Sequence, residues 1–164
     1  RIDPADLPFF LGLLDHLAER GCAVPATIHD RAGAGWRELD GKAVALIEFL
    51  PGVSPSRPTP AQAFAVGAAL ARIHLAARDF PLSRRDPLGP RANAAALTAC
   101  GADQLASIAP ELPRCIDMAQ AIADRWPSQL PSSIIHSDLF PDNVLLLGDR
   151  VTGLIDFYFA CSGL

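Results

Sequence analysis

Apolar side chains at the start of the chain recur at helical spacing and make one continuous stripe. Asp3-Pro4 before the stripe supplies an N-cap and a first-turn proline, and Gly21 after it is a typical helix end. The pattern therefore predicts an amphipathic helix between Asp3 and Gly21 with one face in the core. The stripe consists of Leu7, Phe10, Leu11, Leu14, Leu17 and Ala18.

Two runs after this helix predict β-strands. Residues 36–39 form a short run, and residues 42–50 are almost entirely apolar, so we expect the second strand to be central and buried. Residues 51–58 are rich in proline, glycine and serine and predict a linker. Thr59-Pro60 then predicts the start of another helix, with Thr59 as the N-cap.

Helical spacing returns after a proline-rich loop at residues 78–91. We expect helices at residues 94–107 and 110–126. The apolar side chains of the second of these helices share one face, so we interpret them as core residues. They are Ile116, Met118, Ala119, Ile122 and Trp126.

A polar loop lies between two apolar runs near the end of the chain, and a hairpin follows it. Gly148-Asp149 predicts the tight turn of this hairpin, with glycine at the first central position. Asn143 opens the first strand and Asp156 ends the second, thirteen residues later. Because a hairpin of this length brings its two ends together, we expect Asn143 and Asp156 to face one site.

The residue types in the loop suit phosphoryl transfer. His136-x-Asp138, followed by Asn143 and then Asp156, has the spacing of a kinase catalytic loop and its metal-binding Asp. Asp138 is the candidate for accepting or orienting the proton of an acceptor hydroxyl, and Asn143 and Asp156 offer the hard oxygen ligands that suit Mg²⁺. For His136 we expect structural support of the loop. The alternative interpretation is a plain turn, in which Asp and Asn are common, with His136 buried and bonded to the backbone.

Composition narrows the class of protein. The chain has 164 residues, of which 50% are hydrophobic and 20% charged, as in a globular domain. A net charge of −4 without a basic run argues against a nucleic-acid partner, and no apolar stretch approaches the roughly 18–20 residues of a membrane span. The chain opens without a signal peptide, and its four cysteines are widely spaced. We therefore expect reduced thiols and a cytoplasmic location, with a functional role for Cys161, close to Asp156, as the alternative.

Two details of the motif distinguish it from protein kinases. Ser137 stands where protein kinases have Arg, and Asp156 lies in Ile-Asp-Phe in place of Asp-Phe-Gly. In this the chain resembles the aminoglycoside phosphotransferase/choline kinase superfamily of small-molecule kinases. Within that superfamily, residues 136–144, 153–161 and 6–17 are similar to bacterial homoserine kinases. The resemblance covers nearly the whole chain and is strongest at its two ends.

The resemblance implies an α+β, protein kinase-like two-lobed fold that is incomplete, with part of the small lobe plus much of the helical large lobe. Residues 1–50 would be the remnant of the small ATP-binding lobe, residues 51–60 the hinge or linker, and residues 61–164 the helical catalytic lobe, truncated at its C-terminal end. Backbone groups of Glu48, Phe49 and Leu50 would bind adenine as the cofactor-binding hinge.

The resemblance also implies ATP and Mg²⁺ as cofactors and L-homoserine as acceptor, in threonine biosynthesis. Arg91 and Asn93 lie where homoserine kinases have a Pro-Arg-x-Asn element, so they are candidates for substrate binding. The alternative, which fits slightly better, is an exposed Arg and a helix-capping Asn. The first helix departs from the family because its stripe carries no Glu to order the phosphate-binding lysine. Asp6 and Asp15 are the nearest acids, and we assign neither to that role.

Three functions remain open on the sequence. The first is a kinase for homoserine, or for another small hydroxyl acceptor such as choline, an aminoglycoside or a sugar. The second is a metal-dependent hydrolase in which His136, Asp138 and Asp156 surround Zn²⁺ or Mn²⁺, which leaves Asn143 without a role. The third is a piece of a longer kinase that is inactive alone.

The third possibility rests on elements that this sequence lacks. The chain begins at Arg1 without Met and continues for only eight residues after Asp156. It has no glycine-rich loop, and its one lysine, Lys42, follows the first helix. We therefore expect a part of a longer protein that does not transfer phosphate by itself, because phosphoryl transfer depends on fixing the donor phosphates.

Overall fold

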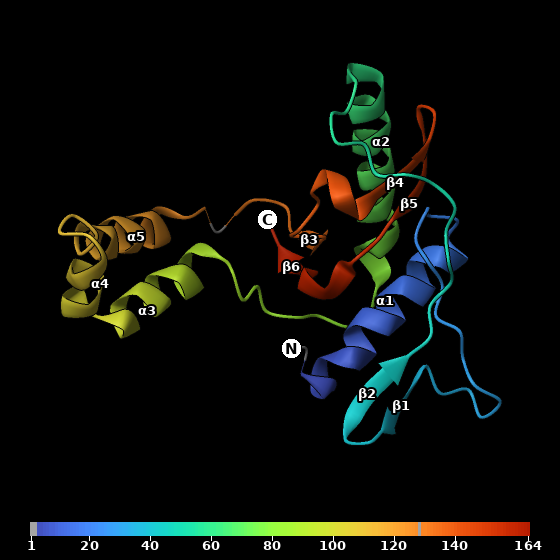
Figure 1. Cartoon of the computed structure of the whole chain (residues 1–164), viewed down its shortest axis with the longest axis horizontal. Coiled ribbons are helices and arrows are strands. Elements are labelled where there is room, and N and C mark those ends of the chain that lie inside the picture. Colours follow the sequence, from blue (N-terminus) through green and yellow to red (C-terminus); the bar gives the residue numbers. More distant parts are fainter. Residues whose placement is uncertain (1–2, 128) are drawn as a thin grey trace. The chain divides into compact units, whose positions relative to one another are not determined.

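The computed structural model of the chain describes residues 3–127 and 129–164. They fall into two compact units, one formed by Arg1–Arg84 with Ser133–Ser162 and the other by Arg85–Ser132 with Gly163–Leu164. The first unit mixes helices and strands, and the second is built from helices (Figure 1). The predicted boundaries at residues 50 and 60 differ from this division and stay a prediction.

The first helix of the chain starts at the predicted N-cap. The Asp3 carboxylate accepts a hydrogen bond from the backbone N–H of Ala5 at 3.0 Å and opens a short 3-10 turn, Pro4–Asp6. The turn continues into α1, Leu7–Glu19. Gly21 follows with φ of 70°, in the left-handed region that favours glycine. The predicted helix is confirmed, and its buried side chains are Leu7, Phe9, Phe10, Leu11, Leu13, Leu14 and Leu17.

The core of the first unit forms where α1 meets helix α2, Pro60–Ala76, and the strands on either side of the polar loop at residues 136–143. Thr59 is the N-cap of α2, as predicted, and exchanges hydrogen bonds with Gln62 in a capping box. Burial of apolar surface is the main force that holds these elements together. Side chains of this core outside α1 are Val24, Ile73, Ala77, Ile134, Val144, Leu146, Leu154, Phe157 and Ala160.

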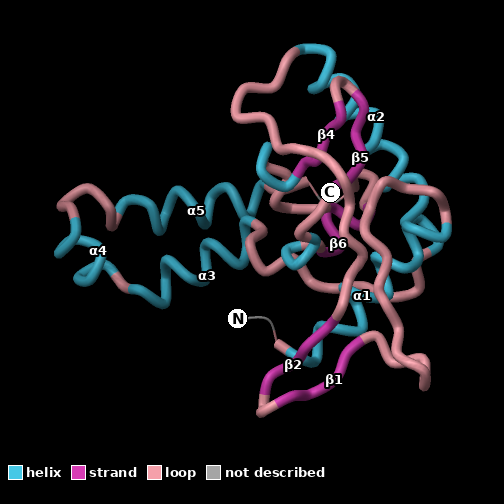
Figure 2. Tube along the Cα trace, turned by 45° about the vertical axis from the view of Figure 1, so that its right-hand side comes forward, coloured by secondary structure: helices cyan, strands magenta, loops and turns pink. Residues whose placement is uncertain are grey.

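The predicted buried strand at residues 42–50 is shorter and more exposed than expected. It forms β2, Lys42–Ala45, which pairs antiparallel with β1, Trp36–Leu39, in a two-stranded hairpin (Figure 2). Val44 is 42% exposed. The prediction of a central strand is therefore wrong, because an apolar run does not reveal how many neighbours cover it. Asp40 and Gly41 form the turn with φ of 51° and 69°, which suits an Asp-Gly pair.

The rest of that apolar run leaves the hairpin and bonds to an earlier extended segment. The backbone N–H of Ile28 donates to the carbonyl of Leu46 at 2.9 Å, and the N–H of Glu48 donates to the carbonyl of Ala26 at 2.9 Å. This pairing ends at the hinge candidates, so their path is fixed from one side by residues 26–28.

The predicted hairpin near the end of the chain is confirmed. Strand β4, Val144–Leu147, pairs antiparallel with β5, Arg150–Leu154, and Gly148 makes the turn with φ of 62°. Strand β3, Ser133–Ile135, pairs with β6, Cys161–Gly163. The polar loop that carries the candidate catalytic residues connects β3 of this pair to β4 of the hairpin.

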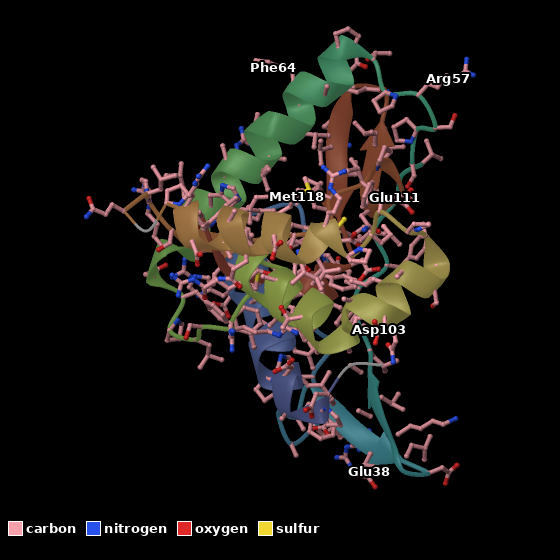
Figure 3. All side chains as sticks on the ribbon, turned by 90° about the vertical axis from the view of Figure 1, so that its left-hand side faces the viewer. Glu38, Arg57, Phe64, Asp103, Glu111 and Met118 are labelled. Atoms are coloured by element: carbon pink, nitrogen blue, oxygen red, sulfur yellow. The ribbon has the colours of Figure 1, made fainter. Side chains whose placement is uncertain are left out.

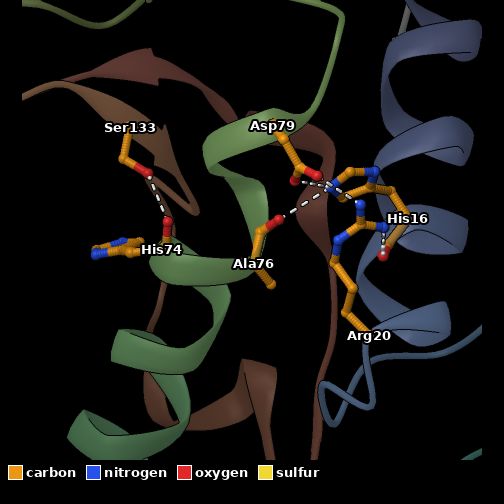
Figure 4. Close-up of polar contacts among 6 residues, drawn as sticks. All are labelled: His16, Arg20, His74, Ala76, Asp79 and Ser133. Atoms are coloured by element: carbon orange, nitrogen blue, oxygen red, sulfur yellow. Dashed lines mark hydrogen bonds and ion pairs between the residues drawn. The ribbon is translucent and has the colours of Figure 1, made fainter.

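Polar contacts fasten α1 to the end of α2 (Figure 4). The Nε2 atom of His16 lies 2.9 Å from the carbonyl oxygen of Ala76 and 3.2 Å from a carboxylate oxygen of Asp79. Arg20 donates to the other Asp79 oxygen at 2.7 Å, and this hydrogen bond is the main cause that lowers the pKa of Asp79. The two helices are therefore joined by both apolar packing and charge.

Arg84 is the last residue of the first segment of the first unit, and it is hydrogen-bonded to β6. The backbone N–H of Ser162 donates to the carbonyl of Arg84 at 2.8 Å, and the Arg84 N–H donates to the Ser162 hydroxyl at 3.3 Å. The Arg84 guanidinium also pairs with Asp6 at 2.9 Å. The chain thus leaves the first unit at Arg84, next to the strand that pairs with the re-entering β3.

The second unit consists of α3, Pro90–Cys100, α4, Ala102–Ile108, and α5, Arg114–Arg125. The predicted helix at residues 94–107 starts earlier and is interrupted, because Gly101 adopts φ of 82° between α3 and α4. Among the described residues, no helix in either unit is long and apolar enough to cross a membrane.

The apolar face of α5 is only partly buried, which corrects the prediction of core residues: Ile116 and Ala119 are half-buried and the other three are exposed. Helix α3 packs against α5, yet Met118, labelled in Figure 3, is 60% exposed, and Ile122 and Trp126 are about half-exposed. A unit of this size has too little interior to cover every apolar side chain. The helical spacing of the apolar residues correctly predicted the helix α5. The burial of its side chains depends on which elements pack against it, and the sequence pattern does not describe those.

Candidate active site

The loop between β3 and β4 is folded back on itself by hydrogen bonds to Asp138. The side-chain amide of Asn143 donates to the Asp138 carbonyl oxygen at 2.7 Å and to its carboxylate at 3.3 Å. The backbone N–H of Phe140 donates to the same carbonyl oxygen at 2.9 Å. Ser137, with φ of 64°, provides the reversal that lets the loop close. Asp138 is half-buried, with its carboxylate held beside Asn143.

The two ends of the β4–β5 hairpin meet at this loop. The backbone N–H of Ile155 donates to the carbonyl oxygen of Asn143 at 3.0 Å, which places Asp156 one residue from that contact. Asp156 is exposed and adopts the left-handed conformation, with φ of 63° and ψ of 59°. That conformation is uncommon for a residue other than glycine, and it is often found at functional sites. Asp138, Asn143 and Asp156 therefore lie at one end of one hairpin.

The donor set fits a magnesium ion. Because the amide nitrogen of Asn143 is bonded to Asp138, its amide oxygen is the atom that can bind a cation, and the exposed Asp156 supplies carboxylate oxygens. In the described part of the chain, no three His, Cys, Asp or Glu side chains gather into a metal site. A two-ligand protein site of this kind suits Mg²⁺, which keeps water and binds substrate phosphates.

His136 is buried between the loop and the hairpin. Its Nδ1 atom accepts a hydrogen bond from the N–H of Asp138 at 3.3 Å, so Nε2 carries the proton and donates to the carbonyl oxygen of Ile155 at 2.9 Å. Its ring packs on Phe157, with 4.5 Å between ring centroids. With both nitrogens bonded to backbone, His136 cannot bind zinc beside Asp138 and Asp156, which contradicts the hydrolase alternative. The contacts support a structural role in holding the loop.

We expect His136 to make the protein less stable in mild acid. Burial lowers the pKa of His136, so the folded protein keeps the ring neutral where the unfolded chain already binds a proton. Stability is then highest above about pH 6.5, the unfolded value, and falls as the pH drops toward the lower folded pKa. The midpoint of thermal unfolding should therefore fall less on acidification for His136→Asn than for the wild-type protein.

The exposed His29 provides the control for this measurement. Its pKa is raised, first by its hydrogen bond with the Gly33 carbonyl and then by Asp15. A raised pKa contributes stability below the unfolded value, which is opposite in sign to the contribution of His136. His29→Asn removes this contribution, so its midpoint of thermal unfolding should fall at least as much on acidification as that of the wild type. Equal acid losses in His136→Asn and the wild type would contradict the assignment.

The hinge candidates lie at the surface of the first unit. Phe49 is 91% exposed, Glu48 is exposed and Leu50 is half-buried. The Glu48 N–H is bonded to Ala26, so the groups left for a nucleotide are the Glu48 carbonyl and the backbone beyond it. Adenine binding by these three residues stays a prediction.

Arg91 and Asn93 lie on α3, in the second unit. The N-cap of α3 is Gly89, so the alternative role of Asn93 as helix cap is wrong. The Asn93 amide instead donates to the carbonyl of Leu88 at 2.7 Å. Their contact with a substrate stays a prediction.

The two acids near the first helix are engaged elsewhere. Asp6 pairs with Arg84, and Asp15 accepts a hydrogen bond from the N–H of Thr27 at 2.9 Å and contacts His29 at 2.7 Å. Both carboxylates therefore hold loops of the first unit, which is consistent with leaving them unassigned.

The sequence analysis missed one feature of the site, the attachment of the linker to the hairpin. Val53 and Leu146 exchange two backbone hydrogen bonds of 3.0 Å each. The hydroxyl of Ser54 donates to the carbonyl of Asp142 at 3.1 Å, next to Asn143. The only sequence signal was glycine at positions where backbones approach closely.

Curated relatives match the chain along its length. It is 45% identical over 163 residues to the homoserine kinase of Bradyrhizobium sp. (strain BTAi1 / ATCC BAA-1182), a match that covers 99% of this chain and 50% of that protein. It is 46% identical over 165 residues to the homoserine kinase of Acidiphilium cryptum (strain JF-5), covering 100% of this chain and 51% of that protein. The chain thus spans about half the length of these curated relatives.

Solved structures of phosphotransferases share the fold. An aminoglycoside-3'-phosphotransferase of type VIII has a TM-score of 0.63 and 23% identity, over 96% of this chain and 60% of that one. A macrolide 2'-phosphotransferase from Brachybacterium faecium has a TM-score of 0.52 and 21% identity, over 98% of this chain and 57% of that one. This likeness confirms the predicted α+β, kinase-like fold, of which the chain covers a part.

The family follows from the match along the sequence. The sequence model of the phosphotransferase enzyme family matches residues 1–164, the full length of the chain. The loop and hairpin that hold Asp138, Asn143 and Asp156 lie inside this match. The chain therefore belongs to the phosphotransferase enzyme family.

Proposed function

We propose that the complete protein transfers the γ-phosphate of ATP to the hydroxyl of L-homoserine. The observation that carries this proposal is the grouping of Asp138, Asn143 and Asp156 by hydrogen bonds at one end of the β4–β5 hairpin. Relatives about 45% identical to the chain are homoserine kinases, which supports the choice of acceptor.

Asp138 is the proposed proton acceptor. In the reaction, the homoserine hydroxyl gives its proton to the Asp138 carboxylate while its oxygen forms a bond to the γ-phosphorus and ADP leaves. Asn143 holds the Asp138 backbone and carboxylate in place through its amide. Since this chemistry depends mostly on positioning, a loop held by several hydrogen bonds suits it.

Asn143 and Asp156 are the proposed magnesium ligands. Mg²⁺, when bound with ATP, neutralises charge on the phosphate oxygens. The Asn143 oxygen and the exposed Asp156 carboxylate would hold it near the loop. Asp156 adopts the left-handed conformation, and its exposed carboxylate would supply an oxygen ligand to the cation.

The remaining roles follow the family resemblance. Backbone groups of Glu48, Phe49 and Leu50 are proposed to bind adenine. Arg91 and Asn93 are proposed to bind the charged groups of homoserine, because its carboxylate and amine need polar partners while the hydroxyl lies at Asp138. Since the reaction consumes ATP, we place it in the cytoplasm.

A screen of acceptors tests the proposed substrate. We expect the complete protein with ATP and Mg²⁺ to phosphorylate L-homoserine with a higher kcat/KM than choline, aminoglycosides or free sugars, measured by coupled ADP release. Homoserine that lacks its amine, 4-hydroxybutyrate, is the matched control and should be a poorer substrate, because a polar partner is then left unpaired. A higher kcat/KM for choline, an aminoglycoside or a sugar would assign a sister activity.

A further inference from the structure

Leu50, the last residue of the hinge candidates, packs on a glycine of the catalytic hairpin. Gly153 is buried in β5, opposite Leu145 in the register of β4. A β-carbon at Gly153 would lie 2.7 Å from Cδ1 of Leu50 and 3.3 Å from Cδ1 of Leu145. In protein structures a β-carbon essentially never lies as close as 2.7 Å to another side-chain atom, so Leu50 would have to move. Leu50 therefore occupies space that exists only because residue 153 has no side chain.

A second glycine lets the linker approach the same hairpin. A β-carbon at Gly52 would lie 2.9 Å from Cβ of Leu145 and 3.0 Å from the backbone nitrogen of Leu146. Gly52 also has φ of 148°, a conformation that other residues rarely adopt. One residue later, Val53 makes its paired hydrogen bonds with Leu146. Side-chain packing at residue 50 and backbone pairing at residue 53 thus fasten one short segment to one hairpin.

The hairpin that receives this segment is the one that carries the proposed magnesium ligands. Asn143 precedes β4 directly, and Asp156 follows β5 by two residues. Ser54 adds a hydrogen bond to the carbonyl of Asp142, next to Asn143. The segment that would bind adenine and the residues that would bind the phosphate-bound metal are therefore parts of one packed assembly within the first unit.

We propose that Gly153 is a positioning residue for ATP. Because Gly153 has no side chain, Leu50 can pack against β5, and this packing sets the position of residues 48–50 relative to Asn143 and Asp156. This inference rests on the proposed kinase function. It assigns Gly153 a role in nucleotide affinity that does not require contact with the nucleotide. The acceptor is not involved, so the role holds for any hydroxyl substrate.

Gly153→Ala in the complete protein tests the proposal. The added methyl group meets the end of a flexible side chain, so the fold should persist while Leu50 and the hinge backbone shift. We expect the Kd of a non-hydrolysable ATP analogue with Mg²⁺, measured by titration calorimetry, to rise about tenfold, because the added methyl group displaces Leu50 and with it the hinge backbone. The KM for the acceptor should stay near that of the wild type.

The same substitution in a Leu50→Ala background separates positioning from a general loss of structure. With the Leu50 side chain shortened, the methyl group has room, so Gly153→Ala should change the Kd little relative to Leu50→Ala alone. Gly67→Ala is the matched control, because a β-carbon there meets nothing within 4 Å, and its Kd should equal that of the wild type.

Direct binding keeps this test independent of the acceptor. An unchanged Kd for Gly153→Ala, or an equal rise in both backgrounds, would overturn the proposal. Leu50→Phe overfills the same space from the side of residue 50, and it replaces Gly153→Ala in the test where that variant does not fold. It should also raise the Kd, and an unchanged Kd would overturn the proposal. Failure of the protein to phosphorylate homoserine would reject the proposed acceptor and leave the binding result interpretable.

Discussion

Asp138→Asn is expected to lower the kcat of the complete protein by about 10²–10⁴-fold, the usual contribution of a general base, with little change in ATP affinity. The substitution keeps the size of the side chain and an oxygen that can accept the hydrogen bond from Asn143. It removes the negative charge and the site to which the hydroxyl proton moves. Steady-state kinetics with saturating ATP, together with direct nucleotide titration, measure the two quantities separately.

Asp142→Asn is the matched control for this prediction. Asp142 lies in the same loop, is exposed, and contributes its backbone carbonyl to the contact with Ser54. The change of charge is identical, so any effect of net charge on the loop appears in both variants. A kcat for Asp138→Asn within a few-fold of that for Asp142→Asn would show that Asp138 is not the proton acceptor.

Asp156→Ala is expected to abolish magnesium-dependent transfer. Loss of a catalytic metal ligand removes several kcal/mol of charge stabilisation, which corresponds to a fall in kcat of about 10³-fold or more. Asn143→Ala should raise the Mg²⁺ concentration needed for half-maximal activity and also lower kcat, because the Asn143 amide holds Asp138. Titration of activity with Mg²⁺ at fixed ATP distinguishes the two responses.

The backbone of Asp156 requires a second variant. Alanine accepts the left-handed conformation less readily than asparagine, so Asp156→Ala changes both the ligand and the local backbone. Asp156→Asn keeps the backbone preference and removes the charge, and it should also lose most activity. Full activity of the wild-type protein in excess chelator would reject the magnesium assignment for all these variants.

Local patterns predicted the elements that depend on local chemistry. The cap at Asp3, the capping threonine at Thr59 and the glycine turn at Gly148 each act through neighbouring residues, and the structure confirms all three elements. The spacing of Asn143 and Asp156 was informative for the same reason, since a two-residue turn fixes which strand ends meet.

Burial and long-range contact were beyond the sequence pattern. The apolar run at residues 42–50 and the face of α5 are partly exposed, because burial is decided by what packs on an element and not by its own composition. The break at Gly101 was missed because a glycine within a helical period is tolerated in many helices. The attachment of Val53 to Leu146 joins residues far apart in the chain, and the nearby glycines do not identify the partner strand.

The entry and exit points of the second unit have a consequence for how such enzymes diversify. The chain leaves the first unit at Arg84, which bonds to Ser162, and re-enters at Ser133, in the strand that pairs with β6. Because the two ends of this segment lie side by side, recombination can replace it with a segment of different length. The elements of the first unit that hold the two ends need not move. Residues 85–132 could therefore be exchanged for a segment of another length while the loop around Asp138 keeps its contacts, and with Arg91 and Asn93 binding the acceptor as proposed, such an exchange would change the acceptor.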